Sequence, residues 1–222
     1  MEILLKTFKE SDYSFAKNLL DSGDLFFQHV SVYQEIEDGE VRGDLNEGQV
    51  VEEYELPVTP NMKKILIGNS DGGKQYVLDL EKVRENIPNL RGAGQSKIRI
   101  NYTVDMLLYC MTYINNKTCN IQYILNNLSR LGKYCVVITD CKGFISKVNS
   151  QIKGKCGLVE YCDMKKSSIF VKKKFYSWQS EYRIGIAANG LKQKLISIGP
   201  LNGFIFDTRD TSFIEQFLRK YK

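Results

Sequence analysis

Short apolar segments of strand-forming residues dominate this sequence and constrain its fold more than any other feature. The last third of the chain alone holds five of them, at residues 157–161, 168–172, 182–187, 194–198 and 204–206. Helical spacing of apolar residues is confined to a few interspersed stretches, of which residues 121–131 are the clearest. Because strands and helices do not alternate regularly, we predict an α+β fold with a mixed β-sheet core and flanking helices, not a doubly wound parallel sheet.

The length of the chain favours one domain. It has 222 residues, close to the usual prior of roughly 100–200 residues per domain. With 43% hydrophobic residues it has ample material for a core. No internal repeat or linker is evident, so we predict a single domain over residues 1–222.

Two local features are expected within this domain. Residues 62–67 and 75–80 flank a Ser-Asp-Gly-Gly turn and are predicted to pair as a hairpin. Gly23 follows a helical stretch that includes Phe15 and Leu19. It is predicted to end that helix because glycine adopts the left-handed conformation at little cost.

The N-terminus and the cysteines indicate a cytoplasmic protein. Residues 1–6 lack the basic segment, long apolar run and cleavage site of a signal peptide. No run approaches the roughly 18 apolar residues of a membrane span, so we expect no membrane partner and reduced thiols. The pairs Cys135/Cys141 and Cys156/Cys162 have five intervening residues, against about two to four in structural zinc sites. We therefore predict no metal site.

The net charge of +5 is unevenly distributed. Residues 35–55 hold nine acids and one base, Arg42, which leaves 30 basic against 17 acidic residues, or +13, elsewhere. Such asymmetry favours a polyanionic partner, and a solvated lysine face is the alternative. The most concentrated basic stretch comprises Lys165, Lys166, Lys172, Lys173 and Lys174.

The most informative segment is residues 175–186, Phe-Tyr-Ser-Trp-Gln-Ser-Glu-Tyr-Arg-Ile-Gly-Ile. Strand alternation puts the apolar even positions 182, 184 and 186 on one face. Gln179, Glu181 and Arg183 then share the other face, below an aromatic turn. This arrangement suits site chemistry; the alternative is a Glu181–Arg183 ion pair at the rim of the sheet, which contributes little.

Gln-x-Glu at the start of a strand, preceded by an aromatic turn, resembles the motif of one branch of ADP-ribosyltransferases. The resemblance implies that Glu181 is catalytic and stabilises the ribosyl cation as nicotinamide leaves, with NAD as co-substrate. It implies that Gln179 contacts the acceptor. Tyr176 or Trp178 would lie on the turn that recognises the target.

The order of several short segments is similar to a prokaryotic family associated with abortive infection. They are Leu-Lys-Thr-Phe at 5–8, Leu-Phe-Phe-Gln-His at 25–29, Arg-Gly-Asp at 42–44, Tyr-Cys-Met-Thr-Tyr at 109–113 and Trp-Gln-Ser-Glu-Tyr-Arg at 178–183.

This order also fits the transferase scaffold, in which Lys6 or Arg42 would bind the pyrophosphate of NAD and Thr112 would brace the site. The sequence departs from that pattern twice. Lys6 replaces the usual first-strand Arg or His and cannot make a bidentate contact. Cys-Met-Thr at 110–112 replaces Ser-Thr-Ser.

Together these features predict an NAD-dependent ADP-ribosyltransferase. The resemblance implies a toxin of antiviral defence, with a neutralising antitoxin as a further partner. The basic stretch favours RNA or single-stranded DNA as acceptor, contacted by Lys172, Lys173 and Lys174, and a protein acceptor is the first alternative.

Two other classes of function stay open. One is a non-catalytic nucleic-acid-binding or antitoxin-like module. The other is a metal-dependent nuclease that uses Asp38, Asp44 and Glu47 as oxygen ligands, although a turn in which Arg42 pairs with Asp44 or Glu47 is the favoured explanation. His29 is the only histidine and lies beside two phenylalanines, so a packed side chain is favoured over a general base.

Overall fold

The structure is a computed structural model that describes residues 2–35, 49–58, 61–67, 76–82, 94–115, 117–118, 121–163, 168–210, 212–213 and 216–217. The chain divides into two compact units. The larger contains residues 1–50 and 102–222, and the smaller contains residues 51–101. The single domain predicted from the length stays a prediction. In the part of the chain that is described, no helix is long and apolar enough to cross a membrane.

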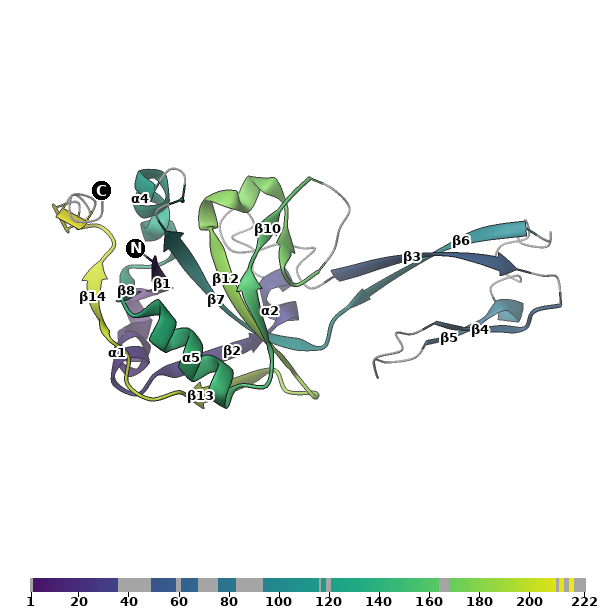
Figure 1. The fold of residues 1–222 in the computed structure, drawn as a ribbon, viewed down its shortest axis with the longest axis horizontal. Coiled ribbons are helices and arrows are strands. Elements are labelled where there is room, and N and C mark those ends of the chain that lie inside the picture. The colour runs from purple at the N-terminus through teal and green to yellow at the C-terminus, as the bar shows by residue number, and fades with distance from the viewer. Residues whose placement is uncertain are drawn as a thin grey trace. The chain divides into compact units, whose positions relative to one another are not determined.

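The larger unit is built on an eight-stranded sheet (Figure 1). Its strand order is β13-β2-β7-β1-β8-β14, with β12 on β7 and β9 on β12. Each of these pairings is antiparallel. The strands are β1 (Glu2–Phe8), β2 (Asp24–His29), β7 (Met106–Asn115), β8 (Tyr134–Ile138), β9 (Lys155–Leu158), β12 (Glu181–Ala187), β13 (Gln193–Ser197) and β14 (Gly203–Asp207).

This architecture confirms the α+β class. The pairings within the eight-stranded sheet are antiparallel and not mixed as expected, and the parallel pair formed by β10 (Glu160–Tyr161) and β11 (Val171–Lys172) makes a separate two-stranded sheet. That the core is of the ADP-ribosyltransferase type stays a prediction.

The sheet is split beside the middle of β7. Strand β12 pairs with residues 106–112 of β7 along one edge. Along the other edge, β2 pairs at residues 107–108 and β1 at residues 112–115, so neither of these two strands pairs with residues 109–111. Backbone polar groups inside a protein need partners. Lys6 supplies one, because its Nζ donates to the carbonyl oxygen of Cys110 at 2.7 Å.

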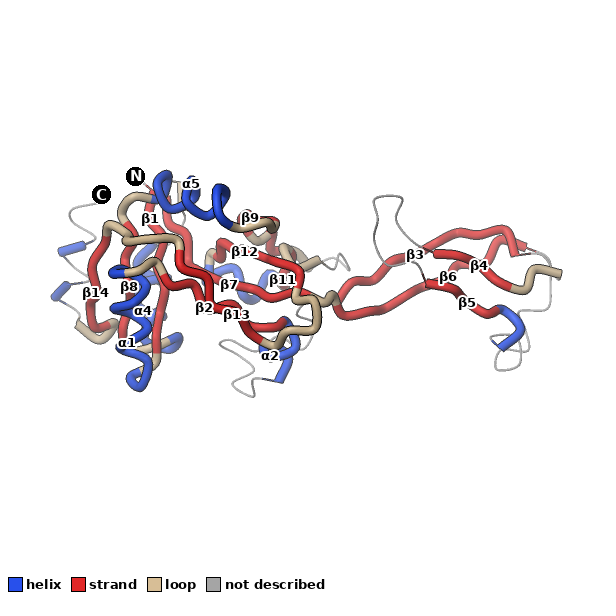
Figure 2. The backbone as a smooth tube through the Cα atoms, turned by 90° about the horizontal axis from the view of Figure 1, so that it is seen from below, coloured by secondary structure: helices blue, strands red, loops and turns tan. Residues whose placement is uncertain are grey.

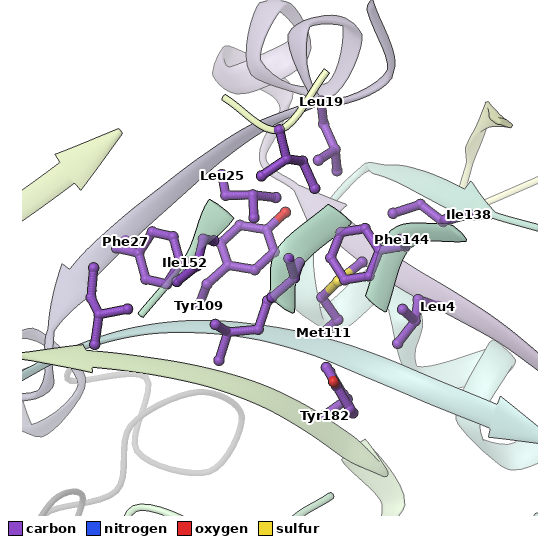
Figure 3. Packing of buried hydrophobic residues seen from close by; sticks show 14 of the residues in the cluster. Leu4, Leu19, Leu25, Phe27, Tyr109, Met111, Ile138, Phe144, Ile152 and Tyr182 are labelled. Carbon is purple, nitrogen blue, oxygen red and sulfur yellow. The ribbon is translucent and has the colours of Figure 1, made fainter. Parts of the chain in front are cut away.

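One face of the sheet carries a continuous apolar core. Helices α1 (Tyr13–Asp21) and α5 (Cys141–Gln151) pack on it through side chains such as Leu19 and Phe144 (Figure 3). A fully buried side chain of this size contributes about 1.5–3 kcal/mol. Gly23 follows α1 at φ +67°, as predicted.

Helix α5 begins at Cys141, directly after a capping residue. Asp140 is its N-cap, and its Oδ1 accepts from the backbone N–H of Gly143 at 2.9 Å. A side chain at Gly143 would lie 2.2 Å from that carboxylate. The cap therefore depends on both residues.

The other face carries two separate apolar clusters. Helix α4 (Ile121–Leu131) places Ile124, Leu125 and Leu128 against Leu5 and its neighbours near β8. Helix α2 (Val30–Glu35) places Val30 against Leu108 and Ile169. Polar side chains of β7 and β12 lie between the two clusters, and the candidate site lies there.

The smaller unit consists of strand pairs (Figure 2). Strand β3 (Gln49–Val58) pairs with β6 (Gly94–Thr103). Strands β4 (Lys64–Ile67) and β5 (Tyr76–Asp79) are antiparallel, which confirms the predicted hairpin.

Candidate active site

A tight turn delivers Glu181 to the sheet. The 3-10 helix η3 (Lys174–Gln179) ends at Ser180, which adopts a left-handed conformation with φ 46° and ψ 52°. A non-glycine residue rarely takes this conformation unless its surroundings hold it there. Ser180 Oγ donates to the carbonyl oxygen of Tyr113 at 2.7 Å, which fixes the turn against β7. Strand β12 begins at the next residue, Glu181.

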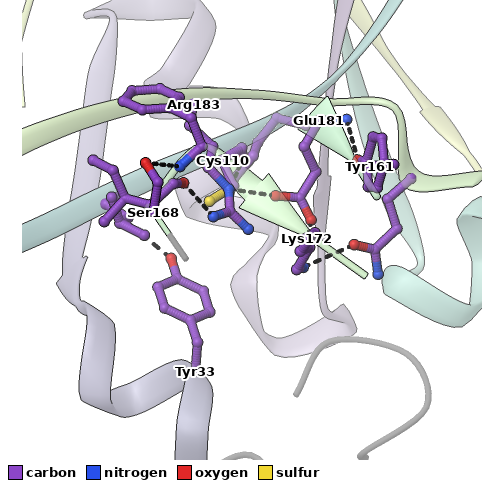
Figure 4. A network of polar contacts seen from close by, with 12 residues as sticks. Tyr33, Cys110, Tyr161, Ser168, Lys172, Glu181 and Arg183 are labelled. Atoms are coloured by element: carbon purple, nitrogen blue, oxygen red, sulfur yellow. Dashed lines mark hydrogen bonds and ion pairs between the residues drawn. The ribbon is translucent and has the colours of Figure 1, made fainter. Parts of the chain in front are cut away.

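Glu181 lies between two buried cations (Figure 4). Its Oε1 is 2.7 Å from Lys172 Nζ, and its Oε2 is 2.7 Å from Arg183 Nε. The side chains of Lys172, Glu181 and Arg183 are 4%, 10% and 1% exposed. Lys172 Nζ also donates to Gln179 Oε1 at 2.9 Å. These four residues are called the ion cluster below.

The ion cluster keeps Glu181 ionised. Burial acts to raise the pKa of this carboxyl, but the charges of Arg183 and Lys172 and their hydrogen bonds outweigh it and hold the pKa at about 2. At neutral pH the cluster therefore carries one negative and two positive charges. Its formal charge is +1, which favours an anionic ligand.

Tyr161 completes the surroundings of Glu181. Its hydroxyl oxygen accepts from the backbone N–H of Glu181 at 2.8 Å. Burial raises the pKa of this phenol, so it is protonated at neutral pH. No pattern in the sequence marked Tyr161.

The ion cluster lines a pocket of about 170 Å³. Thr112, which is paired with Glu181 across β7 and β12, lies in its wall. Residues of β1, β2 and β7 around the split in the sheet, with Tyr33 of α2 and Leu131 of α4, complete the lining. The pocket thus gathers five residues that the sequence singled out, namely Lys6, Thr112, Lys172, Gln179 and Glu181.

Lys6 contributes to this pocket less directly than expected. Its ammonium group donates to Cys110 within the split and lies 4.5 Å from the centroid of the Tyr109 ring, which belongs to the apolar core. In this structure its ammonium group therefore satisfies a backbone carbonyl of the sheet. The alternative cation, Arg42, lies outside the described residues, as do Asp38, Asp44 and Glu47.

The basic stretch divides into buried and exposed members. Lys172 belongs to the ion cluster, whereas Lys173 and Lys174 are exposed. Lys165 and Lys166 lie outside the described residues. The strand expected at residues 168–172 is reduced to Val171–Lys172 because Ser168 starts a turn, with its carbonyl oxygen accepting from the backbone N–H of Val171 at 3.0 Å.

The two aromatic candidates also separate. Tyr176 is buried, and its ring centroid is 5.0 Å from Lys172 Nζ. Trp178 lines a different cavity, described below, with Arg130 at 5.7 Å from its ring centroid. Trp178 is therefore the better placed of the two to meet a target.

The expected contact between Glu181 and Arg183 forms, but not at a rim. Arg183 is among the largest fully buried side chains of the described residues, and its guanidinium also donates to the carbonyl oxygen of Ile169. A buried ion pair must overcome the loss of hydration of both charges, so it is weak evidence for added stability. The cluster thus calls for a functional explanation.

Other chemistries find less support in the described residues. Nowhere in them do three or more His, Cys, Asp or Glu side chains gather as a metal site. His29 hydrogen-bonds Ser31 through Nδ1 at 2.9 Å and lies 3.4 Å from Asp105 through Nε2. It lines neither the pocket of the ion cluster nor the cavity that contains Trp178.

Comparisons with known proteins add no relative. No family model, no curated protein and no solved structure matches the chain.

Proposed function

We propose that this protein is an NAD-dependent ADP-ribosyltransferase that modifies nucleic acid, with Glu181 as its catalytic carboxylate. The observation that carries the proposal is the convergence of Thr112, Gln179 and Glu181 on one pocket, with Glu181 ionised. The resemblance to transferases rests on the same residues, which come from separate segments of the sequence.

The chemistry suits a fixed carboxylate. The bond between ribose C1′ and the nicotinamide nitrogen breaks, and nicotinamide leaves with the electron pair. Positive charge develops on the ribose before the acceptor forms the new bond to C1′ and releases a proton to solvent. A carboxylate held in a site with little water stabilises that charge better than water does. Each oxygen of Glu181 accepts one hydrogen bond from the ion cluster, and a carboxylate has about four acceptor positions.

The excess positive charge of the cluster has a role in this proposal. Two cations around one carboxylate would oppose a developing cation unless an anion balances them. The diphosphate of NAD is such an anion. We therefore assign to Lys172 the diphosphate contact that the resemblance gave to Lys6 or Arg42.

The size of the pocket sets which part of NAD it holds. Pockets for whole drug-sized ligands span about 300–1,000 Å³. A volume of about 170 Å³ is smaller than this range. The nicotinamide-ribose end is the part that must reach Glu181, with the diphosphate at Lys172, so the adenosine end of NAD would lie outside this pocket.

The test is to incubate the protein with NAD labelled in the adenylate portion and with mixed cellular RNA, DNA and protein. Uptake of label by a nucleic-acid fraction is expected. Label on protein alone would mean that the acceptor is protein and not nucleic acid. Folded protein that consumes no NAD would contradict the proposal. In the defence setting that the resemblance implies, induced expression should arrest growth in a manner that requires Glu181.

A further inference from the structure

A second cavity opens on the other side of Glu181. Its volume is about 520 Å³, and it lies where β7, η3 and the first turn of α4 meet. Among the described residues, Glu181 is the only one that lines both this cavity and the pocket of the ion cluster.

The walls of this cavity present aromatic rings. Tyr123, Tyr161 and Trp178 line it, and Tyr123 is 54% exposed. An exposed ring in a cavity offers its face to a flat ligand at little cost in conformational entropy. Leu158, which is also exposed, adds an aliphatic surface.

Polar and basic groups accompany the rings. Asn115 and Ser177 put an amide and a hydroxyl group in the wall, and the exposed Lys117 lines it as well. The guanidinium of Arg130 lies over the Trp178 ring. Glu181, whose charge the ion cluster compensates, is the only acid among the described residues of the lining.

We infer that this cavity binds one unpaired base of a single-stranded nucleic acid. Stacking needs ring faces, base edges need amide and hydroxyl groups, and the phosphates need cations; the cavity supplies all three. A base held here lies beside Glu181, so the cavity would present the acceptor for the transfer proposed above. That last role rests on the proposed function, whereas the binding itself does not.

The inference also differs from what the sequence suggested. The sequence made Tyr176 an equal candidate for recognising the target and Lys172 a contact of the nucleic-acid acceptor. The structure buries both, and it brings in Tyr123 and Lys117 from other segments.

The chain contains its own reporter for this cavity. Trp178 is the only tryptophan, so intrinsic fluorescence observes the cavity directly. The protein is titrated, without NAD, with a single-stranded RNA or DNA oligonucleotide, with its duplex and with an abasic strand of equal length. Quenching by the single strand is expected at concentrations at which the duplex and the abasic strand leave the signal unchanged.

Tyr123→Ala is expected to weaken this binding by about tenfold, the scale of one lost stacking contact. Tyr13→Ala is the matched control, because Tyr13 is 45% exposed on α1, which packs on the other face of the sheet. It should leave the affinity unchanged. Equal quenching by abasic and normal strands, an unaffected Tyr123→Ala variant, or quenching only by an aromatic peptide would each overturn the inference.

Release of nicotinamide from NAD, in the absence of nucleic acid, is measured on the same protein preparations. Tyr13 lines neither cavity, so the control Tyr13→Ala should release nicotinamide at the wild-type rate. Nicotinamide release without base binding would overturn this inference alone. Base binding without nicotinamide release would overturn the proposed transferase and leave the cavity as a nucleic-acid site.

Discussion

The two faces of strand β12 are built from alternate residues and do different work. Tyr182, Ile184 and Ile186 enter the continuous core under α1 and α5. Glu181 and Arg183 face the other way and are buried as ions between two apolar clusters. The first face explains why the chain folds. The second places charges where an apolar side chain would be at least as stable, which is why we assign it the function.

The largest effect on stability is expected from Arg183→Leu. It removes one of the two cations that compensate Glu181 and leaves the carbonyl oxygen of Ile169 without this donor. Breaking a buried ion pair costs about 3–5 kcal/mol. Urea denaturation measures the loss of unfolding free energy.

Ile184→Ala makes the matched change on the first face. Its expected loss is similar, about 2–5 kcal/mol, but NAD turnover per folded molecule should stay at the wild-type level. If Arg183→Leu lowered the free energy of unfolding by less than about 1 kcal/mol, the ion cluster would not be the buried unit described above.

Acid should act on the second face alone. The pKa of Glu181 is about 2 in the folded protein, against an ordinary value of 4.5. A carboxyl with a depressed pKa contributes stability that is fully present above 4.5 and is lost as the pH falls towards 2. The shift corresponds to about 3 kcal/mol. Denaturation of the wild-type protein at pH values between 5 and 2 should show this loss. The Glu181→Gln variant lacks the carboxyl and should not show it.

Gln179→Ala should separate the two chemical steps. The resemblance implies that Gln179, which lines the same pocket as Glu181, contacts the acceptor and that Glu181 faces the ribose. Transfer to nucleic acid should therefore fall by about tenfold more than nicotinamide release, the scale of about 1.4 kcal/mol for one lost polar contact. Gln193→Ala, an exposed position on β13, is the control. Equal losses of transfer and release would mean that the two residues do not divide the work.

The smallest effect is expected at the surface. Replacing Lys173 and Lys174 with Ser should reduce the salt dependence of binding to single strands by about 0.7 log units per lost phosphate contact. Lys153 and Lys155, also exposed, provide a control pair with the same change in charge. Nicotinamide release without acceptor should not change. A salt dependence identical to that of the wild type would remove these two lysines from the interface.

The sequence reached part of this picture because alternation along a strand is a local property. It placed Glu181 and Arg183 on one face, and it located α4 and the hairpin of β4 and β5. Gln179 lines the same pocket, but it belongs to η3 and not to the strand, and it is linked to Glu181 by its hydrogen bond with Lys172. Strand periodicity therefore predicted correctly that Gln179 lies beside Glu181 but did not predict the element that carries it.

The parts that were missed depend on contacts between distant segments. Lys172 sits in a lysine-rich stretch that is typical of a solvated surface, and only its pairing with residues of β10 and β12 buries it. The split that engages Lys6 arises from the registers of β1 and β2 on β7. No pattern within one segment specifies such a register, so neither feature was accessible from the sequence.

The most direct test of the central claim is nicotinamide release from NAD by Glu181→Gln under conditions where both proteins are folded. Removing the charge should lower the rate by on the order of 10²-fold or more. Glu160→Gln, an exposed position on β10 that lines neither cavity, is the control and should keep the wild-type rate. Glu181→Asp retains the charge among Lys172 and Arg183 while withdrawing the carboxylate, so it should fold and still lose activity. Near wild-type release by both Glu181 variants would contradict the account.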